Sequence, residues 1–157
     1  MAVYHGTLAG EEILESGYIN TTSKENSVYG TNEDLDGNLS LKTSEGYVYL
    51  ALEEEKACEF CFSSMVHQQK ALTGGTIYIF EVDVNGLEFY PDYDEVGTMD
   101  IKLSDAMRET RTFAVKDSLE IGERVKRYKK IKVKNSQELS DIIDLGKLRM
   151  YEWTDLD

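Results

Sequence analysis

The chain has few cysteines and no long apolar run. Cys58 and Cys61 are its two cysteines, too few for a disulfide framework, which predicts a protein of the reducing cytoplasm. No apolar segment approaches the roughly 20 residues that a membrane-spanning helix needs. The opening segment Met1 to His5 has neither the basic patch nor the apolar stretch of a signal peptide, so secretion is not expected. These scarcities predict a cytoplasmic protein that does not enter a membrane, and would suit a bacterial or phage source.

Basic residues are scarce too. Lys and Arg number 17 against 30 Asp and Glu, which gives a net charge of −13. A field of that sign repels a phosphate backbone, so nucleic acid is an unlikely class of partner. The exception is the basic segment from Arg124 to Lys134. It could hold a phosphate or a nucleotide, but a solvated edge strand is the simpler interpretation, because lysines protect an edge from pairing with other chains.

The residues that are present predict one α+β domain over 1–157. Its 157 residues are a usual domain length, and 41% apolar residues suffice for one core. Helical and alternating patterns follow one another without regular βαβ order. Segment 76–84 has apolar residues on both faces, which predicts a central strand. Strands are expected at 3–5, 47–52, 76–84, 87–90 and 112–115, with one or two more at 124–133 and a strand or docked tail at 148–153. Helices are expected at 11–16, 53–72, 104–109 and 135–145, where Gly17 ends the first, Ser104 caps the third and Asn135 caps the fourth.

Three segments in a fixed order resemble a known family. Tyr4-His5-Gly6-Thr7 opens the chain, Tyr47-Val48-Tyr49-Leu50-Ala51 follows and leads into a helix, and Gly75-Thr76-Ile77-Tyr78-Ile79-Phe80-Glu81-Val82 comes third. In this order they resemble the ADP-ribosyltransferase fold, over roughly residues 3–92. The likeness is to its His-Gly-Thr branch, with the rifamycin-modifying, diphtheria-toxin-like and poly(ADP-ribose) polymerase-like enzymes. It implies split antiparallel β-sheets with a few flanking helices.

The resemblance also implies a substrate, NAD, from which nicotinamide leaves. His5 would hydrogen-bond a hydroxyl of the adenosine-side ribose, and Gly6 would offer its backbone N–H and C=O to the nicotinamide amide. Tyr49 would stack on the nicotinamide ring, and Tyr47 shares its strand face. No metal is implied, because a carboxylate and the charge of NAD supply the electrostatics. The predicted cofactor-binding set is Tyr4, His5, Gly6, Thr7, Tyr47 and Tyr49.

Each of these residues also has an ordinary interpretation. His5 could be a surface or capping histidine, and Tyr47 or Tyr49 could simply pack a strand. Cys58 and Cys61 fit the core stripe of a helix better than a zinc site, since His67 lies more than a turn away. Glu81, in the central strand, is interpreted as structural.

The third catalytic group is an acid that steadies a cationic transition state. In the rifamycin-modifying enzymes an Asp follows the central strand past a turn, and the matching stretch here is 86–92. Asp92 is the best positional match, which gives a predicted catalytic set of His5, Tyr49 and Asp92. The competing acids are Glu88, Asp94, Glu109 and Glu120.

The predicted function is mono-ADP-ribosyl transfer from NAD to a protein or small-molecule acceptor. The polar loop 21–44 and the acidic segment 92–105 could hold that acceptor, although surface acidity also serves solubility. One alternative is an enzyme like the RNA 2′-phosphotransferases, which resemble basic proteins with several Arg near the site and fit this acidic chain less well. The other is a non-catalytic module that binds a nucleotide or a partner protein.

Overall fold

The chain folds as an α+β protein around antiparallel sheets, as the sequence predicts. The computed structural model describes residues 2–21, 46–92, 95 and 101–157. Within them, the main sheet has the strand order β5-β3-β1-β4-β7-β8, and β2 pairs with β6 in a small second sheet. The strands are β1 (Ala2–Thr7), β2 (Tyr18–Ile19), β3 (Val48–Ala51), β4 (Gly75–Asp83), β5 (Thr112–Val115), β6 (Leu119–Glu120), β7 (Val125–Val133) and β8 (Thr154–Asp155).

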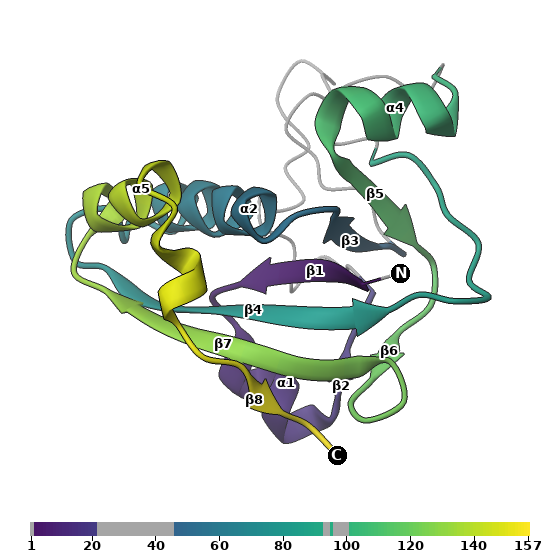
Figure 1. Ribbon diagram of the computed structural model, residues 1–157, viewed down its shortest axis with the longest axis horizontal. Coiled ribbons are helices and arrows are strands. Elements are labelled where there is room, and N and C mark those ends of the chain that lie inside the picture. The colour runs from purple at the N-terminus through teal and green to yellow at the C-terminus, as the bar shows by residue number, and fades with distance from the viewer. Residues whose placement is uncertain (1, 22–45, 93–94, 96–100) are drawn as a thin grey trace, which may run out of the picture.

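Helices cover both faces of the main sheet. α2 lies over β1 and β4, α5 lies beside α2 and against β7, and α1 lies on the opposite side of the sheet (Figure 1). We call the two sides the α2 face and the α1 face. α4 packs near β5, and a short 3-10 helix, η1, follows α5. The helices are α1 (Gly10–Ser16), α2 (Glu54–His67), α4 (Leu103–Thr110), α5 (Ser136–Asp144) and η1 (Lys147–Met150).

The central position of β4 follows from its side chains. β4 pairs with β1 on one edge and with β7 on the other. Ile77 and Ile79 are buried on the α2 face, whereas Tyr78 and Phe80 are buried on the α1 face. A strand with apolar side chains on both faces is stabilised when both faces are buried, because each exposed face forfeits its hydrophobic free energy. Such a strand therefore lies in the middle of the sheet, with other elements over both faces. The predicted two-sided central strand is confirmed.

Helix ends match the sequence where a local signal sets them. Gly17, in the left-handed region with φ 82°, ends α1 as predicted. The side chain of Asn135 accepts a hydrogen bond from the N–H of Glu138 at 2.9 Å, which begins α5 as predicted. Ser104 is not the cap of α4. That helix begins at Leu103 with Lys102 at the capping position and no side-chain cap bond.

Several other boundaries differ from those expected. β1 continues through Gly6 to Thr7, and α2 ends at His67 rather than near residue 72. The expected strand 87–90 is reduced to one bridge between Tyr90 and Ala114. Of the two alternatives for 148–153, the structure has a docked tail: Tyr151 and Trp153 pack against the core between η1 and β8. Apart from Thr21, the expected loop 21–44 lies outside the described residues.

The basic segment forms β7 as a single strand beside the short edge strand β8. β8 pairs with only Arg127 and Tyr128. Along the rest of β7, Lys130 and Lys132 are exposed, as an edge-protecting role predicts. Lys129 departs from this pattern, because it is 3% exposed and its Nζ lies 2.6 Å from Oε1 of Glu54. A buried lysine needs such a partner to stay charged.

Candidate functional site

The main sheet splits between β1 and β3. The registered pair between these two strands is Tyr4 with Ala51, whereas β1 and β4 stay in register along the whole of β1. Leu52 donates its N–H to Arg111 on the β5 side, so alternation turns the backbone groups of Ala51 and Tyr49 toward β1. By the same alternation, Gly6 directs its N–H and C=O toward β3. Beyond the pair of Tyr4 with Ala51, the backbone groups of Gly6 therefore face those of Tyr49 between β1 and β3, and we call this place the split.

His5 reaches into the split from the α1 face. Its Nδ1 lies 2.9 Å from the carbonyl oxygen of Tyr49, 44 residues away in the chain. A carbonyl only accepts, so Nδ1 carries the hydrogen and donates it. The imidazole thus bonds a strand carbonyl that the backbone of β1 no longer reaches. This bond links the two halves of the sheet where the β1–β3 ladder ends.

The same bond sets the chemistry of the other ring nitrogen. Burial lowers the pKa of His5 from its ordinary value of 6.5, while the hydrogen bond to Tyr49 acts in the opposite direction. The ring is therefore neutral at neutral pH. With the proton held on Nδ1, Nε2 has a lone pair and acts as a hydrogen-bond acceptor. A ligand hydroxyl is the kind of group that it can bind.

The lowered pKa of His5 predicts how stability depends on pH. The unfolded chain takes up a proton at a higher pH than the folded chain does, so stability falls with acidification. The contribution of neutral His5 is fully present above pH 6.5 and is lost as the pH falls from there toward the lowered pKa. Between about pH 7.5 and about pH 5, we expect the free energy of unfolding to fall more for wild type than for His5→Gln. Urea denaturation of both proteins measures this, and equal losses would contradict it.

The α2 helix packs so closely against Gly6 that no side chain fits at this position. A Cβ at this position would stand 2.1 Å from the carbonyl oxygen of Ala57 and 3.0 Å from Sγ of Cys61. The α2 helix therefore occupies the space above Gly6, and the requirement for glycine comes from helix packing. Its N–H and C=O lie in the plane of the sheet and point into the split, so the predicted contact with an amide is still geometrically allowed.

Three tyrosines gather where β3 and β5 meet the segment around residue 90. Tyr49 and Tyr90 both lie opposite Ala114, which places them on one face of the sheet. The ring centroid of Tyr47 lies 6.1 Å from that of Tyr49 and 5.9 Å from that of Tyr90. We call Tyr47, Tyr49 and Tyr90 the tyrosine cluster. It lies on the side shared with Ala51, the α2 face, so a ligand that contacts both His5 and these rings must occupy the split itself.

Tyr4 and Thr7 have other partners. The ring of Tyr4 stacks on Trp153 with centroids 6.1 Å apart, and the Arg127 guanidinium carbon lies 4.4 Å from the same indole centroid. Arg127 also makes two hydrogen bonds to Glu81, at 2.6 and 3.1 Å, so Glu81 has a structural role as predicted. Thr7 accepts the N–H of Ala9 at 2.9 Å in the turn before α1. The roles of Tyr4 and Thr7 in binding NAD stay predictions.

The candidate acids are placed very differently. Asp92 is 1% exposed, and its Oδ1 accepts the N–H of Glu95 at 3.1 Å. Glu88 is exposed and accepts a hydrogen bond from the hydroxyl of Tyr90, which raises the pKa of that tyrosine. Glu109 is exposed on α4, and Glu120 belongs to the second sheet beside Tyr18. Asp94 lies outside the described residues. Glu88 is thus the accessible acid that contacts the tyrosine cluster.

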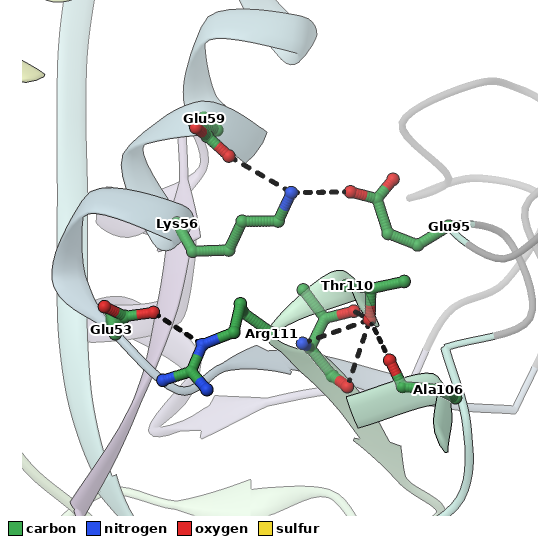
Figure 2. A network of polar contacts seen from close by, with 8 residues as sticks. Glu53, Lys56, Glu59, Glu95, Ala106, Thr110 and Arg111 are labelled. Atoms are coloured by element: carbon green, nitrogen blue, oxygen red, sulfur yellow. Dashed lines mark hydrogen bonds and ion pairs between the residues drawn. The ribbon is translucent and has the colours of Figure 1, made fainter. Parts of the chain in front are cut away.

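A polar network fixes the segment of Asp92 against α2. Nζ of Lys56 lies 3.1 Å from Glu59 and 2.9 Å from Glu95, and Figure 2 shows it between the two carboxylates. Glu95 is the residue whose N–H binds Asp92. Nearby, Nε of Arg111 lies 2.8 Å from Oε1 of Glu53, which joins the end of α4 to the start of α2 (Figure 2). Asp92 is therefore held in place by contacts that lead to α2.

Sequence reasoning missed Tyr90 and Lys116 as members of the site. Nζ of Lys116 lies 4.5 Å from the ring centroid of Tyr90 and 5.6 Å from that of Tyr47. Tyr90 joins the site through its bridge to Ala114, a long-range pairing that no local pattern signals. Lys116 stands two residues after Ala114, so strand alternation places it on the same face once β5 is known.

No metal site or membrane span is found in the part of the chain that the structure describes. No group of three or more His, Cys, Asp or Glu side chains there is arranged to hold a metal ion. Burial raises the pKa of both Cys58 and Cys61, as expected for cysteines in a core. No described helix is both long and apolar enough to cross a bilayer.

No protein-family model and no curated protein matches the chain, so its family stays a prediction that rests on the residues themselves.

Proposed function

We propose that the protein is an NAD-dependent mono-ADP-ribosyltransferase with the ADP-ribosyltransferase fold. One observation carries the proposal: the split between β1 and β3 places the ring of His5 and the backbone of Gly6 opposite Tyr49. These are the three residues that the family resemblance assigns to the two ends of NAD. The split antiparallel sheet and the flanking helices support the same fold.

In the proposed complex, each residue acts through an atom whose surroundings are defined. Nε2 of His5 accepts a ribose hydroxyl, because Nδ1 is already a donor to Tyr49. The N–H and C=O of Gly6 pair with the amide of nicotinamide, and the ring of Tyr49 stacks on the pyridinium. The bond between C1′ of the ribose and the nicotinamide nitrogen breaks, its electron pair leaves with nicotinamide, and the acceptor nucleophile attacks C1′. The protein contributes binding and orientation, which alone can lower a barrier substantially.

The direct experiment is to incubate the purified protein with NAD and measure free nicotinamide by liquid chromatography. Release that depends on protein concentration supports the proposal. Bound NAD that stays intact, in the presence of a cell lysate as the acceptor source, overturns the enzymatic part of it. Mass spectrometry of the same lysate after labelled NAD identifies the acceptor as a protein or a small molecule.

Substitutions can show which of the two carboxylates that flank Tyr90, Glu88 or Asp92, is the catalytic acid. Glu88 is accessible to a ligand, so Glu88→Gln is expected to lower the turnover number for nicotinamide release by about 100-fold. Asp92 is buried and accepts a backbone N–H, so Asp92→Ala is expected to cost about 1 kcal/mol of stability and to change turnover by less than about threefold. Steady-state kinetics and urea denaturation measure both effects. The reverse pattern would assign the acid to Asp92.

A second candidate, a non-catalytic module that binds a nucleotide, is favoured by one observation. Asp92, the acid that the resemblance points to, is almost wholly buried rather than open to a ligand. A module of this kind would bind NAD and ADP-ribose through the split and release no nicotinamide. Calorimetry alongside the nicotinamide assay separates it from the enzyme.

A further inference from the structure

Lys116 lies over the faces of two aromatic rings and has no carboxylate partner among the ion pairs of the described residues. In the described part of the chain, the carboxylate ion pairs engage other basic side chains, namely Lys56, Arg108, Arg111, Arg127, Lys129 and Lys130. Lys116 is exposed, and its contacts are the faces of two aromatic rings, those of Tyr90 at 4.5 Å and Tyr47 at 5.6 Å. An ammonium held over ring faces keeps its hydrogen-bond donors for a ligand.

The position of Lys116 relates it to the proposed NAD site. Tyr47 packs against Tyr49, and Tyr49 forms one side of the split. Lys116 therefore places a positive charge one ring beyond the proposed nicotinamide contact. The protein carries a net charge of −13, so an anionic group that approaches it needs local compensation. Aromatic side chains can stack on the ring of a nucleotide, and a nearby cation can bind its phosphate.

We propose that Lys116, held over Tyr47 and Tyr90, binds the phosphate groups of the dinucleotide whose nicotinamide end lies at Tyr49. The inference rests on NAD as the ligand and extends the proposed function from the reacting end of NAD to its pyrophosphate. Glu88 and Asp117 both lie near the ring of Tyr90, so Lys116 supplies the positive charge that a phosphate needs beside these carboxylates.

The test compares ligands with and without phosphate. Isothermal titration calorimetry measures the Kd of NAD, ADP-ribose and nicotinamide riboside for wild type, Lys116→Met and Lys116→Arg. Loss of one charge-assisted contact is expected to weaken NAD and ADP-ribose about tenfold in Lys116→Met. Nicotinamide riboside, which has no phosphate, is expected to bind unchanged, and Lys116→Arg is expected to stay within about twofold of wild type for all three. Methionine keeps the apolar stem over the rings, so folding should be preserved.

The matched control is Lys132→Met, which removes the same charge from an exposed position of β7. If Lys116→Met and Lys132→Met bind ADP-ribose equally well, the inference is overturned, and so it is if nicotinamide riboside weakens as much as ADP-ribose. Nicotinamide release from NAD is measured on the same samples. Release by wild type that Lys116→Met leaves intact, with an unchanged KM, overturns the phosphate site and keeps the proposed function. Wild type that neither binds nor cleaves NAD overturns both.

Discussion

Replacing His5 with alanine is expected to lower nicotinamide release from NAD by about 100-fold or more. Two losses combine in this variant. The acceptor at Nε2 that would position the ribose is removed, and the carbonyl of Tyr49 loses its donor at the point where the β1–β3 ladder ends. The second loss loosens the strand that carries the stacking ring. Steady-state kinetics with NAD, together with a thermal melt to confirm folding, measure the effect.

The chain offers a matched control for this change. His67 is the other histidine, and its side chain is exposed at the end of α2. His67→Ala is expected to release nicotinamide at the wild-type rate. If both histidine variants keep full activity, the split is not the site of the reaction. If His5→Ala keeps its melting temperature and still loses turnover, the effect belongs to the ligand rather than to folding.

Replacing Gly6 with alanine is expected to destabilise the protein by about 3 kcal/mol, the upper range for forcing an extra carbon into a packed interior. The new Cβ would meet the backbone carbonyl of Ala57 at 2.1 Å, and a backbone atom gives way less readily than a flexible side chain. α2 must move off β1 or the strand must shift. For a chain of this length, we expect the melting temperature to fall by roughly 6–12 °C.

Gly75 provides the comparison for Gly6. It also lies in a strand of the main sheet, and a Cβ there would meet nothing within 4 Å. Gly75→Ala is therefore expected to melt within about 2 °C of wild type, because only conformational entropy and strand propensity change. Equal melting temperatures for the two variants would show that α2 does not rest on Gly6 as described.

Local patterns predicted the parts of the fold that local forces set. Asn135 identified the start of α5, because its capping bond reaches Glu138, only three residues along the chain. The apolar residues on both faces of 76–84 identified the central strand, because that pattern shows which sides of the strand are buried even though its pairing partners are distant in sequence. Ser104 is not the cap, because α4 already begins at Leu103, which packs with Met107 against the core. Tertiary packing overrides a weak capping preference in such cases.

The sequence predicted which residues belong to the candidate site, but it did not predict how their side chains contact one another. The sequence singled out His5, Gly6 and Tyr49, but the bond from His5 to Tyr49 depends on two strands 44 residues apart. The close contact of Gly6 with Ala57 depends on the docking of α2, and that of Tyr90 with Tyr47 depends on a single bridge to β5. Contacts of this kind come from the register of the sheet, which a one-dimensional pattern does not contain.

Nuclear magnetic resonance of the ¹⁵N-labelled protein can show whether NAD binds in the split, as we propose. Addition of NAD is predicted to shift the backbone amides of Gly6 and Tyr49 and the Nε2 resonance of His5, while the amide of Lys132, in β7 and separated from β1 by β4, stays in place. The ring nitrogens should also show the tautomer with its proton on Nδ1 before any ligand is added. Saturating NAD that leaves Gly6, Tyr49 and His5 unmoved would contradict the account.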